Sequence, residues 1–168
     1  MSRGFTLFEL VITLIVLGTL LVVAVPSFTN INNTSQMKRL ADELQGFLIY
    51  AKSEAVWRNK DLWAHLSTAS NPSPAGEWTF TLTDSDTENS GNKLMVLDGS
   101  SYKDIVMVSG YTSEQIKFDG VRGKIKDGHL RFYVRNQTDK VLRLKGSFGG
   151  SRILVCGEGG TVYEFPSC

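Results

Sequence analysis

The sequence predicts an α+β fold, in which a long N-terminal helix packs on a small antiparallel β-rich head. Two patterns carry this prediction. An apolar run from Leu10 to Val25 is followed by a segment whose apolar residues recur at intervals of three and four, which is the period of an amphipathic helix. Beyond Asn59, short runs rich in β-branched and aromatic residues alternate with turn residues, which is typical of antiparallel strands. A chain of 168 residues is long enough for one domain with a core.

The first part of the predicted helix is long and apolar enough to cross a membrane. Its apolar run is broken by Thr13, Gly18 and Thr19. A helix over residues 5–28 has a length of about 36 Å at ~1.5 Å per residue, against a bilayer core of ~30 Å. We therefore expect residues 5–28 to form a transmembrane helix, which is either a cleaved secretory signal, a plain anchor or a specialised leader with its anchor.

Glu9 lies at the start of the apolar run, where a carboxylate is costly. An ionised side chain inside a bilayer costs on the order of 3 kcal/mol by insertion scales. One interpretation is that Glu9 lies at the level of the lipid headgroups and simply ends the span. An ordinary secretory signal fits badly, because residues 24–27 (Ala-Val-Pro-Ser) offer a poor cleavage site.

The residues around Glu9 carry a resemblance to a known family. Residues 4–10 read Gly-Phe-Thr-Leu-Phe-Glu-Leu, and with the apolar run to Pro26 they resemble the class III signal of type IV pilins and type II secretion pseudopilins. The resemblance implies that a prepilin peptidase cuts after Gly4 and methylates the new N-terminus at Phe5. It also implies that Glu9 pairs with the α-amino group of a neighbouring Phe5 in the filament, so that the carboxylate sets the register of assembly.

Pro26 is expected to kink or locally unwind the helix, because proline removes one backbone donor and clashes with the preceding turn. The polar residues 27–35 then predict an irregular neck. An amphipathic helix follows, and we expect its apolar stripe to pack on the head. The stripe consists of Met37, Leu40, Ala41, Leu44, Phe47, Leu48, Ala51 and Ala55.

The predicted organisation has four parts. These are a leader at residues 1–4, a transmembrane or filament-core helix at residues 5–28, the neck and amphipathic half of the helix at residues 29–60, and an extracytoplasmic β head at residues 61–168. The candidate strands of the head are Leu62–Leu66, Trp78–Thr83, Lys93–Leu97, Ile105–Ser109, Gln115–Phe118, His129–Val134, Val141–Lys145, Arg152–Cys156 and Thr161–Phe165.

Three further stretches indicate which subgroup of the family the chain resembles. Residues 51–59, 116–123 and 147–152 resemble the GspH/FimT minor pilins and pseudopilins. Pro26 stands where type IV pilins carry a proline, which favours a minor pilin that supports pilus assembly or initiation; a minor pseudopilin of a type II secretion system is an alternative. The resemblance implies a single-pass inner-membrane protein with a periplasmic head, which joins a pilus through contacts between its N-terminal helix and other pilin subunits.

The head shows no constellation of catalytic residues. No serine lies in a nucleophile-elbow pattern, and no glycine run has the spacing of a phosphate loop. The two histidines, His65 and His129, are far apart in the sequence and have no cysteine nearby. We therefore expect a protein that is not an enzyme and that needs no cofactor and no metal.

The cysteines are Cys156 and Cys168, and the first 155 residues contain none. Such a pair forms a disulfide, half of a metal site or two unrelated thiols. Because the histidines are distant, a tetrahedral metal site is poorly supplied with ligands. We favour a disulfide that closes a C-terminal loop, which implies an oxidising compartment.

Charge is unevenly distributed, although the formal net charge is +1. Residues 61–114 contain eight acidic and two basic residues, a net charge of −6, whereas residues 115–152 contain ten basic and three acidic residues, a net charge of +7. One interpretation is a set of solvated strand faces that pair with the acidic part or with neighbouring subunits. The other is a patch for DNA phosphates, whose binding weakens steeply with salt. Its candidate residues are Arg131, Arg135, Arg143, Lys145 and Arg152.

The resemblance to the pilin family also suggests a function for this basic patch. Some members of the family bind DNA during natural transformation through an arginine-bearing C-terminal loop. Gly150-Ser151-Arg152 lies in the comparable stretch, but Ile153 and Leu154 follow where a second arginine is expected. A DNA-binding minor pilin for DNA uptake is therefore the second alternative function.

Overall fold

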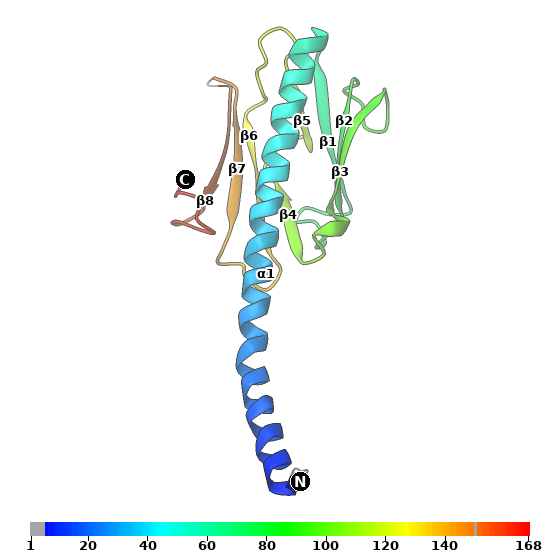
Figure 1. Cartoon of the computed structure of the whole chain (residues 1–168). Coiled ribbons are helices and arrows are strands. Elements are labelled where there is room, and N and C mark those ends of the chain that lie inside the picture. The colour runs from blue at the N-terminus through cyan, green and yellow to red at the C-terminus, as the bar shows by residue number, and fades with distance from the viewer. Residues whose placement is uncertain (1–5, 150) are drawn as a thin grey trace. The chain divides into compact units, whose positions relative to one another are not determined.

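The computed structural model describes residues 6–149 and 151–168, with the side chains of residues 23–28 outside the described part. Within these residues the chain forms a long helix, α1 (Leu7–Arg58), followed by strands and one short 3-10 helix, η1 (Gly99–Ser101) (Figure 1). The chain divides into two compact units, Met1–Ser35 and Gln36–Cys168. The first unit contains the N-terminal part of α1, and the second contains its C-terminal part and both β-sheets.

α1 continues without interruption through Pro26 and the polar residues 27–35. The predicted unwinding at Pro26 and the predicted irregular neck are therefore wrong. Nucleation of a helix is costly, but extension by one residue is not, so a polar stretch between two helix-forming segments remains helical. The proline removes a single backbone hydrogen bond, and the turns on both sides keep the helix continuous.

In the part of the chain that the structure describes, no helix is both long and apolar enough to cross a membrane. Phe5 and the side chains of residues 23–28 lie outside that part, and the assignment of residues 5–28 as a transmembrane segment stays a prediction.

The unit Gln36–Cys168 contains two antiparallel four-stranded sheets. The first sheet has the order β3-β2-β1-β5, built from β1 (Leu62–Thr68), β2 (Trp78–Thr83), β3 (Lys93–Asp98) and β5 (Gln115–Phe118). The second has the order β4-β6-β7-β8, built from β4 (Ile105–Ser109), β6 (Gly128–Val134), β7 (Leu142–Ser147) and β8 (Arg152–Gly157).

The C-terminal part of α1 packs over both sheets of this unit and runs lengthwise along them (Figure 1). All eight residues of the predicted apolar stripe are buried there, which confirms that the stripe packs on the head. Phe47 of the stripe lies with its ring centroid 6.0 Å from that of Phe80 on β2, and Phe80 lies 6.1 Å from Trp78. The core is therefore a layer between one helix and the inner faces of two sheets.

The predicted strands are confirmed with small shifts at their ends, except for the last, residues 161–165. There the chain reverses instead of extending. Val162 and Phe165 exchange backbone hydrogen bonds of 3.2 and 2.9 Å, and the two residues between them, Tyr163 and Glu164, have φ angles of 49° and 69°. Two successive residues in the left-handed region form a tight turn, so this segment cannot form a strand.

Candidate functional site

Glu9, the predicted assembly residue, lies in the first turn of α1, two residues after the helix begins at Leu7. Its N–H donates to the Thr6 hydroxyl oxygen at 3.3 Å. A carboxylate is stabilised there, because the free N–H groups of a helix N-terminus carry partial positive charge. Gly4 and Phe5, the predicted processing residues, lie outside the described residues.

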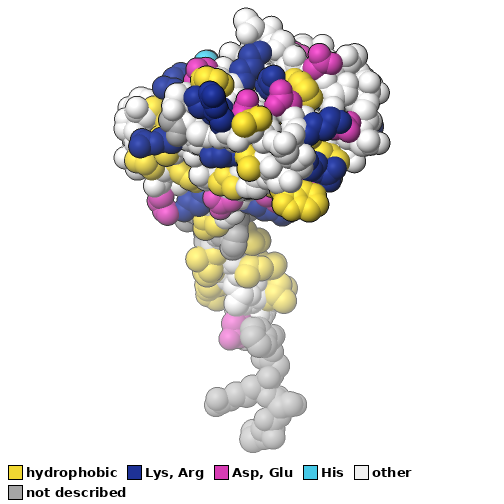
Figure 2. All heavy atoms as spheres, turned by 90° about the horizontal axis from the view of Figure 1, so that it is seen from above, with side chains coloured by type: hydrophobic (Ala, Val, Ile, Leu, Met, Phe, Trp, Pro, Cys, Tyr) yellow, Lys and Arg dark blue, Asp and Glu magenta, His cyan; other side chains and the backbone are white. Residues whose placement is uncertain are grey.

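The described surface of this helical segment is apolar on every side. Its large hydrophobic side chains from Leu7 to Val22 are between 42% and 84% exposed. Figure 2 shows hydrophobic atoms on this segment. Complete burial of a fully exposed side chain of this kind is worth about 1.5–3 kcal/mol, so surrounding these partly exposed side chains with apolar groups is favoured by on the order of 10 kcal/mol for the segment.

The hydroxyl groups within the segment do not oppose this burial. Thr13 donates its hydroxyl to the Leu10 carbonyl, and Thr19 donates to the Val16 carbonyl, both at 2.8 Å. These hydrogen bonds stay within the helix, so no external partner is needed when water is removed. Glu9 is the ionisable residue of the stretch 7–22, and it therefore needs a partner in any apolar environment.

A second candidate site is the outer face of the sheet β4-β6-β7-β8. Arg131 on β6 lies directly opposite Arg143 on β7, and two residues along the same strands His129 lies opposite Lys145. Ser147 of β7 pairs with Arg152 of β8. Four of the five predicted DNA-binding residues therefore lie on one face. Arg135 does not, because it follows the end of β6, where its N–H donates to the Asp104 carbonyl at 2.8 Å.

Glu158 neutralises part of this face. One oxygen of its carboxylate forms an ion pair with the Arg131 Nη2 at 2.9 Å, and the other oxygen pairs with the Arg143 guanidinium. Glu158 follows β8 directly, and its own N–H donates to the Val141 carbonyl at 3.0 Å. Sequence reasoning missed Glu158, because nothing in the spacing of residues 131, 143 and 158 indicates that they meet.

Lys145 and Arg152 are not paired with acidic side chains among the described residues. Both side chains are exposed. With Ser147 and Leu154 they line a hollow of about 160 Å³ on the β7–β8 hairpin. The free positive charge of the face is thus at this end of the hairpin, next to the two arginines that Glu158 holds.

His129 responds to the charges of the same face. Burial lowers the pKa of His129, and the nearby Arg143 and Arg131 lower it further, as does Lys145, while Glu158 acts in the opposite direction. Each of these groups comes from the outer face of β6, β7 or the residue after β8. The face therefore favours the neutral imidazole.

The predicted disulfide is confirmed between Cys156 and Cys168, with an S–S distance of 2.04 Å. It closes the C-terminal loop onto the buried end of β8, where Cys156 lies. Backbone hydrogen bonds from the Gly157 N–H to the Pro166 carbonyl, 2.8 Å, and from the Cys168 N–H to the Gly157 carbonyl, 3.1 Å, hold the same loop. Within the described residues no group of three His, Cys, Asp or Glu side chains is placed to hold a metal ion.

Solved structures share this fold. The type IV minor pilin FimU of Pseudomonas aeruginosa superposes with a TM-score of 0.56 at 18% identity, covering 79% of this chain and 97% of the FimU chain. The minor pseudopilin EpsH from the type 2 secretion system of Vibrio cholerae superposes with a TM-score of 0.50 at 13% identity, covering 73% of this chain and 97% of EpsH. These likenesses show that the chain has the fold of these minor pilins and pseudopilins.

The sequence places the chain within the type IV pilin and pseudopilin superfamily. The family described as "Type II transport protein GspH" matches residues 40–150, so the chain belongs to the GspH family. The type IV major pilin protein PilE1 of Neisseria gonorrhoeae is 24% identical over 144 residues, which cover 84% of this chain and 56% of PilE1. The chain therefore spans about half the length of this relative. Membership of the superfamily implies association with the cell envelope or with a pilus.

Proposed function

We propose that this chain is a minor pilin, a non-enzymatic subunit that is incorporated into a type IV pilus and supports its assembly or initiation. The observation that carries the proposal is the apolar surface of residues 7–22, whose large side chains are exposed on every side of the helix. A surface of this kind needs a lipid environment before assembly and the helices of other pilin subunits afterwards. The proposal thus includes an inner-membrane anchor and a periplasmic head that reaches the cell surface with the pilus.

Processing and assembly follow from the same segment. A prepilin peptidase removes residues 1–4 by cleavage after Gly4 and methylates Phe5. Glu9 then pairs with the α-amino group of a neighbouring subunit, since an unpaired carboxylate among packed apolar helices is costly. The hydroxyls of Thr13 and Thr19 support this packing, because their hydrogen bonds are already made within the helix.

Substitution of Glu9 tests the proposal. Glu9→Leu keeps the segment apolar but removes the charge, so we expect normal membrane levels and strongly reduced recovery of the protein in sheared pili. Glu164→Gln removes an exposed carboxylate of the head and serves as the matched control. Equal incorporation of Glu9→Leu and the parent protein contradicts the proposed pairing.

The alternative is a minor pseudopilin of a type II secretion system. It has the same physical basis, and the family description and the likeness to EpsH support it, whereas Pro26 and the relative PilE1 support the pilus. Deletion of the gene in its own host separates the two functions. Loss of surface pili with unchanged secretion of type II substrates supports the minor pilin, and the reverse supports the pseudopilin.

DNA binding is a second candidate function. Lys145 and Arg152 favour it, because they lie exposed on one face without an acidic partner among the described residues. Glu158 opposes it, because it holds the two arginines beside them. We expect any DNA affinity of the full chain to depend on the free pair and to fall steeply as salt is raised.

The test is a titration of the full chain in detergent with duplex DNA at several salt concentrations. The double variant Lys145→Ala with Arg152→Ala is compared with Arg135→Ala, which removes a positive charge away from this face. Loss of binding in the double variant alone supports a DNA-uptake pilin. Absence of binding at low salt leaves a subunit whose basic residues serve contacts with other pilins.

A further inference from the structure

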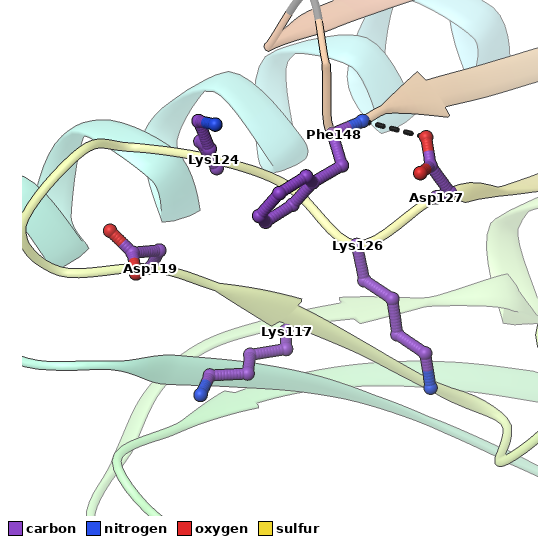
Figure 3. A pocket seen from close by; sticks show the side chains of 6 residues that line it. All are labelled: Lys117, Asp119, Lys124, Lys126, Asp127 and Phe148. Atoms are coloured by element: carbon purple, nitrogen blue, oxygen red, sulfur yellow. Dashed lines mark hydrogen bonds between the residues drawn. The ribbon is translucent and has the colours of Figure 1, made fainter.

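A hollow of about 540 Å³ in the unit Gln36–Cys168 shares no lining residue with the hollow of Lys145 and Arg152. Figure 3 shows the side chains that line it, with the ring of Phe148 between Lys124 and Lys126. The lining residues are Lys117, Asp119, Lys124, Lys126, Asp127 and Phe148. The hollow thus combines three lysines, two aspartates and one aromatic ring.

Three segments build the hollow: two that follow each other closely in the sequence, and the turn that carries Phe148. Lys117 belongs to β5, the edge strand of its sheet. Residues 124–126 run beside that edge, where the Asp119 N–H donates to the Lys124 carbonyl at 2.8 Å and the Lys126 N–H donates to the Lys117 carbonyl at 2.9 Å. Phe148 comes from the turn between β7 and β8, and its side chain is 46% exposed.

The two aspartates of the lining are occupied by the backbone. Asp119 accepts the N–H groups of Val121 and Arg122 at 3.1 and 2.6 Å, and Asp127 accepts the Phe148 N–H at 2.7 Å. Each carboxylate therefore holds a turn in place, and its hydrogen bonds go to the chain and not to the lysines that surround it.

The lysines differ in their partners. Lys117 pairs with the Asp61 carboxylate at 2.6 Å. The Lys124 ammonium lies 4.4 Å from the centroid of the Phe148 ring, and the Lys126 ammonium donates to the Ser113 hydroxyl at 2.9 Å. Among the described residues, neither Lys124 nor Lys126 contacts a carboxylate. The hollow therefore offers two ammonium groups, without an ion-pair partner in the part of the chain that the structure describes, beside a half-exposed aromatic ring.

We propose that this hollow is the docking site for an acidic segment of a neighbouring protein subunit, in which two carboxylates and an apolar side chain lie on one face. The carboxylates pair with Lys124 and Lys126, and the apolar side chain packs on Phe148. The identification of the partner as another subunit rests on the proposed function, whereas the chemistry of binding does not.

The arrangement of charge favours a peptide over a nucleic acid. Affinity for nucleic acids comes from several phosphates that are neutralised together, and the hollow has two free cations. The carboxylates of Asp119 and Asp127 are also part of the lining, so a continuous run of phosphates meets repulsion there. A peptide with two carboxylates needs to reach only the two lysine ammonium groups.

A defined peptide provides the test. In an extended chain every second side chain lies on the same face, so the fluorescein-labelled peptide Gly-Glu-Ser-Phe-Ser-Glu-Gly presents two carboxylates around one phenyl ring. Its binding to the full chain in detergent is measured by fluorescence anisotropy, and a peptide with glutamines in place of both glutamates is the ligand control. The full chain is also tested with a single-stranded thymidine oligonucleotide.

We expect Lys124→Gln and Lys126→Gln each to weaken binding about tenfold, because a hydrogen bond to a charged group is worth about 1.5 kcal/mol or more. Phe148→Ala weakens it as well. Lys140→Gln removes the same charge from an exposed turn outside the hollow and leaves binding unchanged. Thermal unfolding of each variant establishes that the head is folded.

Several results overturn the proposal. Equal binding of the glutamine peptide, equal effects of Lys124→Gln and Lys140→Gln, or no binding at millimolar peptide each exclude an acidic docking segment. Tighter, lysine-dependent binding of the oligonucleotide identifies a nucleic-acid site instead. The Glu9→Leu variant must bind the peptide like the parent protein, so failure of docking and failure of pilus incorporation are observed separately.

Discussion

Replacement of Glu158 by glutamine tests the charge balance on the outer face of the second sheet. Arg131 and Arg143 are direct cross-strand neighbours on β6 and β7, and the Glu158 carboxylate contacts both guanidinium groups. Like charges directly opposite each other on a sheet are destabilising. Glu158→Gln keeps the shape of the side chain, removes two ion pairs and leaves the two arginines facing each other.

The expected loss is moderate, because the three groups are partly solvated. The side chains of Arg131, Arg143 and Glu158 are 39%, 35% and 20% exposed. Exposed ion pairs contribute about 0.2–1 kcal/mol each, and the repulsion between the arginines adds to the loss, so we expect Glu158→Gln to lower the free energy of unfolding by about 1–2 kcal/mol. For a chain of this length the corresponding fall in Tm is about 5 °C.

Thermal and urea unfolding of the full chain measure this loss at low and at high salt. Glu164→Gln is the matched control, because Glu164 pairs with Lys38 at 2.7 Å but is 83% exposed, and we expect no measurable change there. The effect of Glu158→Gln shrinks in high salt as the charges are screened. A variant that unfolds like the Glu164→Gln control, or whose loss grows with salt, refutes the reasoning.

Three further predictions concern the C-terminal loop and the response to acid. Cys168→Ser opens a loop whose cysteines are 12 residues apart, so we expect a loss of about 3 kcal/mol in urea unfolding, and reduction of the parent protein must have the same effect. The pKa of His129 lies below its ordinary value because of burial and the neighbouring arginines. Its contribution to stability is therefore fully present above about pH 6.5 and is lost as the pH falls from there through the lower pKa of the folded state, so His129→Asn is expected to be less sensitive between about pH 7 and 5. The Asn92 N–H and then the Lys60 ammonium lower the pKa of Asp84 to about 2, so Asp84 contributes stability that is lost as the pH falls from about 4 toward 2, and unfolding titrations of Asp84→Asn must lack this step.

Most of the head followed from local patterns in the sequence. The apolar residues of the amphipathic helix recur with the period of a helix, and every member of the stripe from Met37 to Ala55 is buried. The strand boundaries follow runs of β-branched and aromatic residues between turn residues. These patterns are readable because each depends on neighbours within a few positions of the chain.

The errors arose where a local preference was overridden. The polar residues 27–35 have weak helix preference, but they continue a helix that is already formed on both sides. Residues 161–165 have the composition of a strand, but the left-handed conformations of Tyr163 and Glu164 reverse the chain inside the disulfide loop. In both places the surrounding structure decided the conformation.

The sequence by itself determined the apolar N-terminal segment with its single carboxylate, the family resemblance, the helix stripe, the strands and the pair of cysteines. Each of these depends on residue types at short spacing. Only the tertiary structure decided that Glu158 holds Arg131 and Arg143, that Lys145 and Arg152 remain free beside them, and that Lys124 and Lys126 meet Phe148 in one hollow. Such contacts depend on strand register and on turns that join distant segments. Local sequence patterns therefore do not predict them.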